Sequence, residues 1–209
     1  CLFSDAQLRE TGLGPEGFVA HAKPGSVFVS HTTGTVSTLN ELAATSDAPP
    51  VILDAPVSGT ADNIADGTLT VLVGGPADAV ERARPVLAAY ADPIVATGEL
   101  GTALDIKLIN NLLFAANAQL VAAAAELGQS LGVSPAKLLE ALMVCSGGSK
   151  ASSYAVKIGD VDAFATMAGP FLRKDVAACQ EAAAEAGTDL GLLGRVVETG
   201  PLNLTQKHP

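Results

Sequence analysis

The chain changes character at the stretch GELGTALDIKLINN, which runs from Gly98 to Asn111. Before it, short runs rich in β-branched residues alternate with helical stretches, and this alternation is typical of an α/β sheet. Strands are expected at residues 27–29, 51–53, 69–73 and 94–95, with helices at Val36–Thr45 and Ala77–Tyr90. After Gly101 no strand is expected.

A long helix is expected to follow directly. Thr102 and Asp105 have the spacing of a capping box, and Gly132 stands where a left-handed residue would end the helix. Further helices are predicted after Ser134-Pro135 and at Ser149–Ile158, Phe171–Ala186 and Leu190–Thr199. The sequence therefore predicts an α/β part over residues 1–100, followed by an all-helical domain over residues 101–209.

Composition narrows the function classes. Of the 209 residues, 48% are hydrophobic and 16% are charged, so the chain can bury a large core. The formal net charge of −10 disfavours general binding to nucleic acid or to an anionic membrane. Three cysteines without a C-x-x-C pair favour reduced thiols and a cytoplasmic protein. No metal site is expected, because the histidines, which are His21, His31 and His208, have no metal-ligand spacing.

Three other stretches have ordinary structural interpretations. The apolar run Leu112–Ala125 is too short and too interrupted by polar residues for a membrane span, and suits a buried helix. Gly12–Gly17 matches G-x-G-x-x-G, but the preceding residues are helix-like, so a surface loop is favoured over a dinucleotide fingerprint. Ser146–Lys150 lacks the Walker and S-x-x-K spacings, so a turn with Ser149 as a helix cap is favoured.

A loop that could bind a ligand follows the strand at residues 51–53. Open α/β sheets bind ligands beyond the carboxyl ends of their strands. In this loop Ser58 offers a hydroxyl, and Gly59 would let a ligand approach the backbone. An ordinary turn is an equally good interpretation. Ser58 does not lie in G-x-S-x-G and is not read as a nucleophile.

Lys107 and Asn111 are four residues apart, so they share one face of the predicted long helix. The neighbouring residues are apolar, and a lysine in such a setting either extends to solvent or has a chemical role. Partial burial would lower its pKa toward neutrality, which suits proton transfer. A second lysine, Lys174, lies in the helical segment FLRKD, where a solvated charge cluster is the simpler interpretation.

Taken in order, these pieces resemble the β-hydroxyacid dehydrogenase family, the relatives of 3-hydroxyisobutyrate dehydrogenase and 2-hydroxy-3-oxopropionate reductase. The resemblance covers nearly the whole chain. It implies the C-terminal part of a Rossmann-type NAD(P)-binding domain followed by an all-α domain with a long interdomain helix. The matching stretches are Lys23–Ser26, His31–Thr33, Asp54–Gly59, Gly67–Leu69, Val73–Gly75, Gly98–Asn111 and Lys174-Asp175.

The resemblance implies roles for particular residues. Lys107 corresponds to the catalytic acid/base, and Asn111 to the amide that orients the substrate. Ser58 and Gly59 correspond to the loop that holds the substrate carboxylate, in which Thr60 replaces a second glycine. The reaction implied is hydride transfer between a nicotinamide cofactor, NAD or NADP, and a small 3-hydroxy acid. A homo-oligomer is also expected.

On the cofactor side, Thr33 corresponds to the threonine near the nicotinamide, and Lys174 to a lysine that reaches the cofactor or substrate. Leu2 and Phe3 correspond to a cofactor-contacting Leu-Pro pair, with Phe3 in place of the proline. The opening residues read like the end of a buried strand, so a chain cut inside a domain is expected, without the glycine fingerprint and without the acidic or basic residue that selects NAD or NADP. This leaves a rival interpretation, an inactive fragment or paralogue that only associates with other subunits. Imine reductases, which share the fold, are a weaker rival because they generally lack the lysine at position 107.

Overall fold

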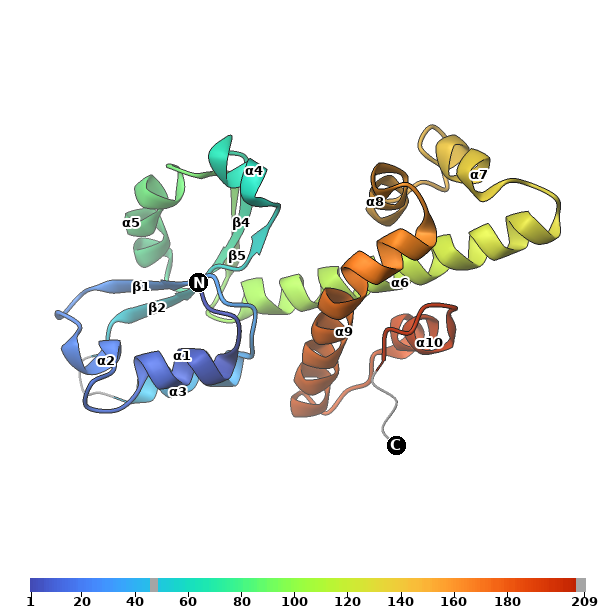
Figure 1. Ribbon diagram of the computed structural model, residues 1–209. Helices are drawn as coiled ribbons and strands as arrows, with labels where there is room; N and C mark the ends of the chain where they lie inside the picture. Colours follow the sequence, from blue (N-terminus) through green and yellow to red (C-terminus); the bar gives the residue numbers. More distant parts are fainter. Residues whose placement is uncertain (46–48, 206–209) are drawn as a thin grey trace. The chain divides into compact units, whose positions relative to one another are not determined.

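The computed structural model describes residues 1–45 and 49–205, so His208 lies outside the described residues (Figure 1). The chain divides into two compact units, Cys1–Lys107 and Leu108–Pro209. The boundary falls inside the longest helix, α6 (Thr102–Ser130). The described part is therefore a mixed α/β unit and a helical unit, each with its own core.

A five-stranded mixed sheet forms the centre of the first unit. Strand β1 pairs with β2 in parallel, β4 pairs with β5 in parallel, and β4 runs antiparallel to both β2 and β3. The strands are β1 (Val27–Ser30), β2 (Val51–Asp54), β3 (Val57–Ser58), β4 (Leu69–Gly74) and β5 (Ala91–Gly98). The helices of this unit are α1 (Asp5–Gly12), α2 (Phe18–His21), α3 (Val36–Ala44), α4 (Ala61–Ala65) and α5 (Ala77–Leu87).

The carboxyl ends of four strands meet in one row across this sheet. Ser30 pairs with Asp54, Asp54 pairs with Gly74, and Gly74 pairs with Gly98. Each of these residues is the last of its strand. The row arises because β2 and β4 run toward each other and overlap only at their ends. The segments that leave the four strands consequently start side by side.

Helices cover both faces of the sheet (Figure 1). On one face, α5 buries Val80 and Leu87 against Leu53 and Val71. The opposite face carries α1, α2 and α3, whose buried residues pack with Ile52. Neighbouring residues of β2 thus enter different cores, as the alternation of side chains along a strand requires.

The second unit is entirely helical among its described residues. After α6 come α7 (Pro135–Leu142), α8 (Lys150–Ile158), α9 (Val161–Glu185) and α10 (Gly191–Thr199). Small residues of α6 such as Ala115 and Ala118 are fully buried, which allows Phe164 and Leu172 of α9 to share one core with this helix. Gln119 on α6 is also buried and holds residues 197–202 through three hydrogen bonds.

Four details differ from the sequence-based expectations. The predicted strand end at Leu2-Phe3 is wrong, because residues 1–4 are not in a strand and Phe3 is 66% exposed. The capping box at Thr102 is wrong as well, since Thr102 is already the first helical residue and its hydroxyl donates to the Glu99 carbonyl. Helix α9 starts at Val161, ten residues before the predicted start at Phe171. The short elements α2, β3 and α4 were not predicted.

Helix α6 is longer than the apolar stretch considered from the sequence. By length and composition it could cross a membrane, with a mean hydropathy of 1.4 over an 18-residue window. However, 56% of that window is buried within the structure, and the helix also buries polar Asn111 and Gln119. These features are those of a helix that belongs to a protein core.

Candidate active site

Lys107 lies in the second turn of α6, and Asn111 lies one turn further along the same helix. The Lys107 side chain is half-buried, whereas that of Asn111 is only 8% exposed. The Oδ1 atom of Asn111 accepts a hydrogen bond of 3.1 Å from Asn110. The helix therefore presents an amine and a carboxamide with the spacing that places them on one face.

Ser58 and Gly59 are exposed at the end of β3. Ser58 pairs with Thr70 of β4, so the sheet fixes its backbone position. Gly59 has φ +144°, and a Cβ atom here would lie 2.8 Å from Leu69. Both the backbone conformation and the close contact thus require glycine, which leaves the backbone of this loop accessible to a ligand.

Thr60 has a structural role of its own. It is the N-cap of α4 and forms a capping box with Asn63. Its backbone amide and its hydroxyl both donate to the Oδ1 atom of Asn63, over 2.9 and 3.2 Å. Its donors are committed to this cap, so within the predicted carboxylate loop Ser58 and Gly59 are the better candidates for a ligand contact.

The predicted nicotinamide side is built where β1 ends and α1 begins. The Leu2 amide donates to the Thr32 hydroxyl over 3.0 Å, so the chain start is tied to the loop that carries Thr33. Asp5 accepts hydrogen bonds from both the amide and the hydroxyl of Thr35, at 2.9 and 3.0 Å. Half-buried Leu2 and Thr33 therefore offer an apolar surface and a hydroxyl on a fixed loop.

These residues fit the nicotinamide end of a dinucleotide. They do not form a pyrophosphate cradle, because the Gly12–Gly17 string follows helix α1 rather than a strand. A Cβ atom at Gly12 would lie 2.4 Å from Leu42, so close packing accounts for that glycine. Within the first unit, the cofactor side is therefore expected at the segments around Leu2, Phe3 and Thr33.

Lys174 belongs to the second unit, where it lies half-buried on α9 beside Asp175. Phe171, one turn before it, is 65% exposed. Lys174 and Lys107 therefore belong to different units, and the structure describes the surroundings of Lys174 within the helical unit.

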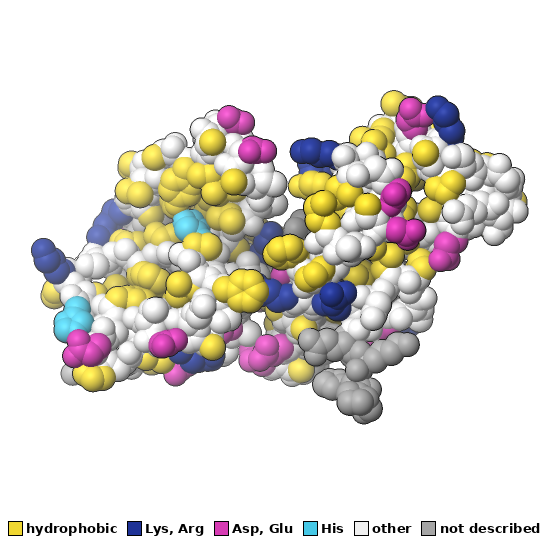
Figure 2. Space-filling view, viewed as in Figure 1, with side chains coloured by type: hydrophobic (Ala, Val, Ile, Leu, Met, Phe, Trp, Pro, Cys, Tyr) yellow, Lys and Arg dark blue, Asp and Glu magenta, His cyan; other side chains and the backbone are white. Residues whose placement is uncertain are grey.

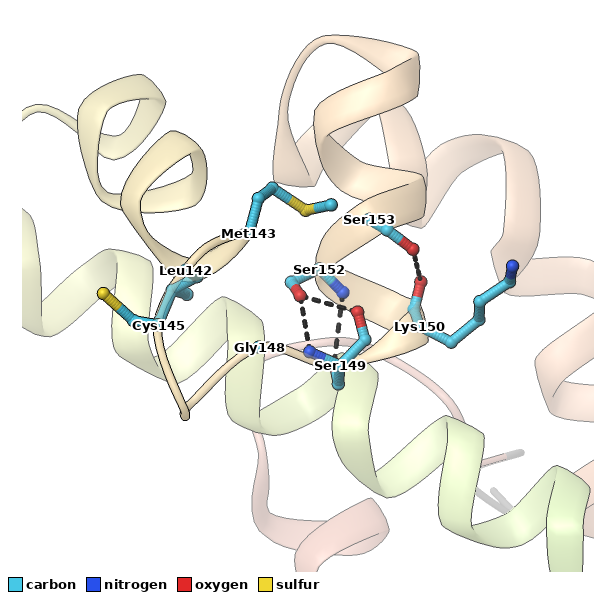
Figure 3. A pocket seen from close by; sticks show the side chains of 8 residues that line it. All are labelled: Leu142, Met143, Cys145, Gly148, Ser149, Lys150, Ser152 and Ser153. Carbon is cyan, nitrogen blue, oxygen red and sulfur yellow. Dashed lines mark hydrogen bonds between the residues drawn. The ribbon is translucent and has the colours of Figure 1, made fainter.

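The turn at residues 146–150 is a helix cap, as expected from the sequence. Ser149 caps α8 and exchanges hydrogen bonds with Ser152 (Figure 3). The residues around this turn line a cavity of about 350 Å³, and the Lys150 side chain extends away from Leu142 and Cys145 there (Figure 3). The serines are thus engaged in local structure rather than arranged as a nucleophile.

Asp54 is a polar residue of this region that was not predicted to have a role of its own. Its side chain is fully buried, and its two oxygens accept from the amides of Gly101 and Leu104, each over 2.9 Å. Asp105, on the same turn of α6, has a raised pKa, chiefly because burial disfavours its charge and also because of the negative charge of Asp54. A buried aspartate at a strand end, inside the Asp54–Gly59 stretch, was the signal available in the sequence.

The distribution of charge and of metal-binding side chains adds no other site. Lysine and arginine side chains are scattered over the visible face of each unit rather than gathered into one patch (Figure 2). Within residues 1–45 and 49–205, no three His, Cys, Asp or Glu side chains are placed to hold a metal ion. The segments near the row of strand ends therefore remain the candidate site.

Comparisons with known proteins match both parts of the chain. A family model described as the NAD binding domain of 6-phosphogluconate dehydrogenase matches residues 1–98. A second, described as NAD-binding of NADP-dependent 3-hydroxyisobutyrate dehydrogenase, matches residues 101–200. The two models meet close to the start of α6.

Individual relatives point the same way. A 3-hydroxyisobutyrate dehydrogenase of Pseudomonas aeruginosa is 32% identical over 194 residues, which cover 88% of this chain and 65% of that protein. An NAD-dependent L-serine dehydrogenase of the same species is 36% identical over 138 residues, 66% of this chain and 46% of that protein. The chain thus spans less than two thirds of the length of these relatives.

Solved structures share the fold. The 3-hydroxyisobutyrate dehydrogenase of Mycobacterium tuberculosis, determined with L-serine, superposes with a TM-score of 0.79 at 27% identity. The superposition covers 94% of this chain and 70% of that one. The chain belongs to the β-hydroxyacid dehydrogenase family, whose members are oxidoreductases that use NAD or NADP.

Proposed function

We propose that the protein interconverts a small 3-hydroxy acid and its semialdehyde or keto form, with Lys107 as the acid/base and NAD or NADP as the hydride carrier. The observation that carries this proposal is the row formed by Ser30, Asp54, Gly74 and Gly98. The segments bearing Thr33, Ser58 and Lys107 leave three of these four strand ends. Such a convergence of strand ends is where open α/β sheets bind their ligands.

Lys107 would exchange the proton of the reacting hydroxyl. During oxidation its neutral Nζ atom takes the hydroxyl proton while the C–H hydride leaves, and during reduction the ammonium returns that proton to the oxygen. Asn111, one turn away, would hold the same oxygen through its carboxamide. The two groups together would fix the reacting carbon with respect to the proton acceptor.

Ser58 and Gly59 would hold the substrate carboxylate. The Ser58 hydroxyl is a suitable donor, and the glycine permits close approach of a carboxylate to the backbone. This binding selects a hydroxy acid over a simple alcohol. Thr60 is expected to affect the site through the capping of α4, because both of its donors bind Asn63.

Leu2, Phe3 and Thr33 would contact the nicotinamide, with Lys174 reaching the cofactor or substrate from the helical unit. When bound, the nicotinamide ring accepts or supplies the hydride. The fixed Thr33 loop would orient one face of the ring, and the exposed Phe3 would shield it from water.

We propose that the partner of the chain is a second copy of itself. Ile109, Leu113, Leu120 and Leu127 follow heptad spacing along α6, and each is 47–61% exposed. A repeat of this kind buries its apolar side chains against another helix. Replacing Leu120 and Leu127 by Glu is expected to reduce the molecular mass measured by light scattering to that of one subunit, and an unchanged mass would contradict this.

The test of the enzymatic proposal is Lys107→Ala in the full-length protein, assayed with a panel of small 3-hydroxy acids. We expect the turnover number to fall by roughly 100-fold or more, the usual contribution of a general acid/base. The affinity for NAD(P), measured by calorimetric titration, should stay unchanged. A fully active Lys107→Ala variant, or a wild type that turns over no hydroxy acid with either cofactor, would overturn the proposal.

A further inference from the structure

The carboxylate of Asp54 closes the amino-terminal end of α6. It lies at the end of β2, its side chain is fully buried, and its two oxygens separately accept from the amides of Gly101 and Leu104. These amides belong to the group of helix-start donors that lack partners within the helix. A negative charge at this end is also favoured by the helix dipole. Asp54 therefore replaces the local cap that Thr102 does not provide.

The neighbouring strand leaves space for this carboxylate only because it ends in glycine. A Cβ atom at Gly74 would lie 2.5 Å from the Asp54 Oδ1 atom and 2.7 Å from the Glu99 carbonyl oxygen. Asp54 and Gly74 are also the one residue pair that joins β2 to β4 in the described sheet. The carboxylate thus occupies a site that three separate segments of the first unit build together.

Asp54 is connected to both predicted reaction segments by short stretches of chain. Ser58 follows it by four residues along β3, where the pairing with Thr70 fixes the backbone. Lys107 follows the hydrogen-bonded Leu104 by three residues, about 4.5 Å along a helix that rises roughly 1.5 Å per residue. One side chain therefore sets the position of the α6 start relative to the strand that leads to the carboxylate loop.

We propose that Asp54 is a positioning residue for the reaction, which holds the Lys107 helix in register with the Ser58-Gly59 loop through its bonds to Gly101 and Leu104. This inference rests on the proposed dehydrogenase function. Asp54 itself does not touch the substrate. Its loss lets the first turn of α6 shift, so the amine and the bound hydroxyl lose their alignment.

The experiment compares Asp54→Asn and Asp54→Ala in the full-length protein by steady-state kinetics and by hydrogen exchange of the peptide that spans residues 100–107. Asn keeps the shape of the side chain and one acceptor oxygen, but its carboxamide NH2 group would face one of the two backbone amides, Gly101 or Leu104. Ala removes both acceptors. For Ala we expect the turnover number to fall roughly 100-fold, because a misplacement of about 1 Å suffices for such a loss. The Asn variant should be intermediate.

The KM for the cofactor should remain at the wild-type value in both variants, while the 100–107 peptide exchanges faster. If Ala at this position prevents folding, the Asn variant carries the test alone. Asp160→Ala is the matched control, since Asp160 caps α9 by accepting from the Ala163 amide and alanine removes this acceptor. That variant should expose the start of α9 to exchange and keep full turnover.

The outcomes separate the two proposals. Wild-type turnover in the Asp54 variants, beside an inactive Lys107→Ala variant, would overturn the positioning role and leave the proposed function intact. A rise in cofactor KM with unchanged turnover would overturn it too. An active Lys107→Ala variant would overturn the proposed function and the positioning role with it. Reduced turnover together with faster exchange at residues 100–107 supports the inference.

Discussion

The Nε2 atom of His31 lies 2.7 Å from the hydroxyl oxygen of Tyr90, and the two rings meet edge to face. On its other side, the Nδ1 atom of His31 contacts the carbonyl oxygen of Ala55. A carbonyl can only accept, so Nδ1 carries the proton and neutral Nε2 accepts from the Tyr90 hydroxyl. The ring connects the segments that follow β1 and β2 to the residue before β5.

This neutral imidazole predicts a loss of stability in mild acid. Burial lowers the pKa of His31 from its ordinary 6.5, more than the Ala55 contact raises it. The unfolded chain therefore binds the proton first, and the stability that His31 contributes is lost as pH falls below 6.5 toward the lower folded pKa. Urea unfolding between about pH 5 and 8 should therefore show a free energy of unfolding that decreases as the pH falls, and the slope of this dependence measures the effect.

The slope should flatten in His31→Gln and persist in His21→Gln, because His21 is exposed. Equal slopes in wild type and His31→Gln would show that other groups cause the acid sensitivity.

Ser58→Ala is predicted to weaken substrate binding more than it slows turnover. A hydrogen bond to a charged group contributes about 1.5–3 kcal/mol, so the KM of the hydroxy acid should rise roughly tenfold or more. The turnover number should change little, since the carboxylate is held similarly in ground and transition states. Ser130→Ala, near the far end of α6, should leave KM unchanged. If Ser58→Ala behaves like Ser130→Ala, the carboxylate binds elsewhere.

Gln119→Leu is predicted to destabilise the helical unit strongly. The Gln119 amide donates to the carbonyls of Val197 and Leu202 and accepts from the Leu202 amide, all within 2.7–2.8 Å. Leucine would leave one buried and two partly buried backbone groups without these partners, at a cost of about 3 kcal/mol. Denaturant unfolding measures this. The control, Gln129→Leu, changes an exposed residue of the same helix and should cost far less.

Ser30→Ala is predicted to stabilise the first unit. Among the described residues, the Ser30 hydroxyl is buried without a hydrogen-bond partner. Its removal should raise the free energy of unfolding by about 1 kcal/mol, since an unsatisfied buried polar group carries a desolvation penalty. Ser152→Ala should have the opposite effect, because the Ser152 hydroxyl bonds both the amide and the carbonyl of Ser149. Destabilisation by Ser30→Ala would reveal a bond to this hydroxyl in solution.

Local patterns in the sequence were sufficient for most elements of the fold. Runs of β-branched residues predict strands β1, β2 and β4. Gly132 predicts where the long helix α6 ends. The start of α9 is not predicted in this way, because Pro170 interrupts the helical pattern. The helix continues through this proline because Phe164 and Leu172, on either side of it, are both buried in the unit's core. Tertiary packing here outweighs a local preference.

The cap of α6 marks the limit of local reasoning at the candidate site. Thr102 and Asp105 have the correct spacing for a cap, but the acceptor comes from Asp54, almost fifty residues earlier. Only the strand pairing brings Asp54 to this helix, and pairing across the sheet is not encoded in any single segment. Lys107, Asn111 and Ser58 could be selected from the sequence because the residues next to them form recognisable local patterns. These are an apolar helix around Lys107 and Asn111, and a loop after a strand around Ser58.

For protein engineering, the row of strand ends also divides the sheet, which should be kept, from the connecting segments, which can be changed. Residues 31–35 leave this row as a short connection outside the β-ladders, whereas Val57 and Ser58 in the connection at residues 55–60 pair with β4. Loop libraries or grafts from other dehydrogenases can therefore be confined to residues 31–35. Asp54 and Gly74 should stay constant in every library member. Their pairing joins β2 to β4, and Asp54 also bonds the start of α6, which all variants would share.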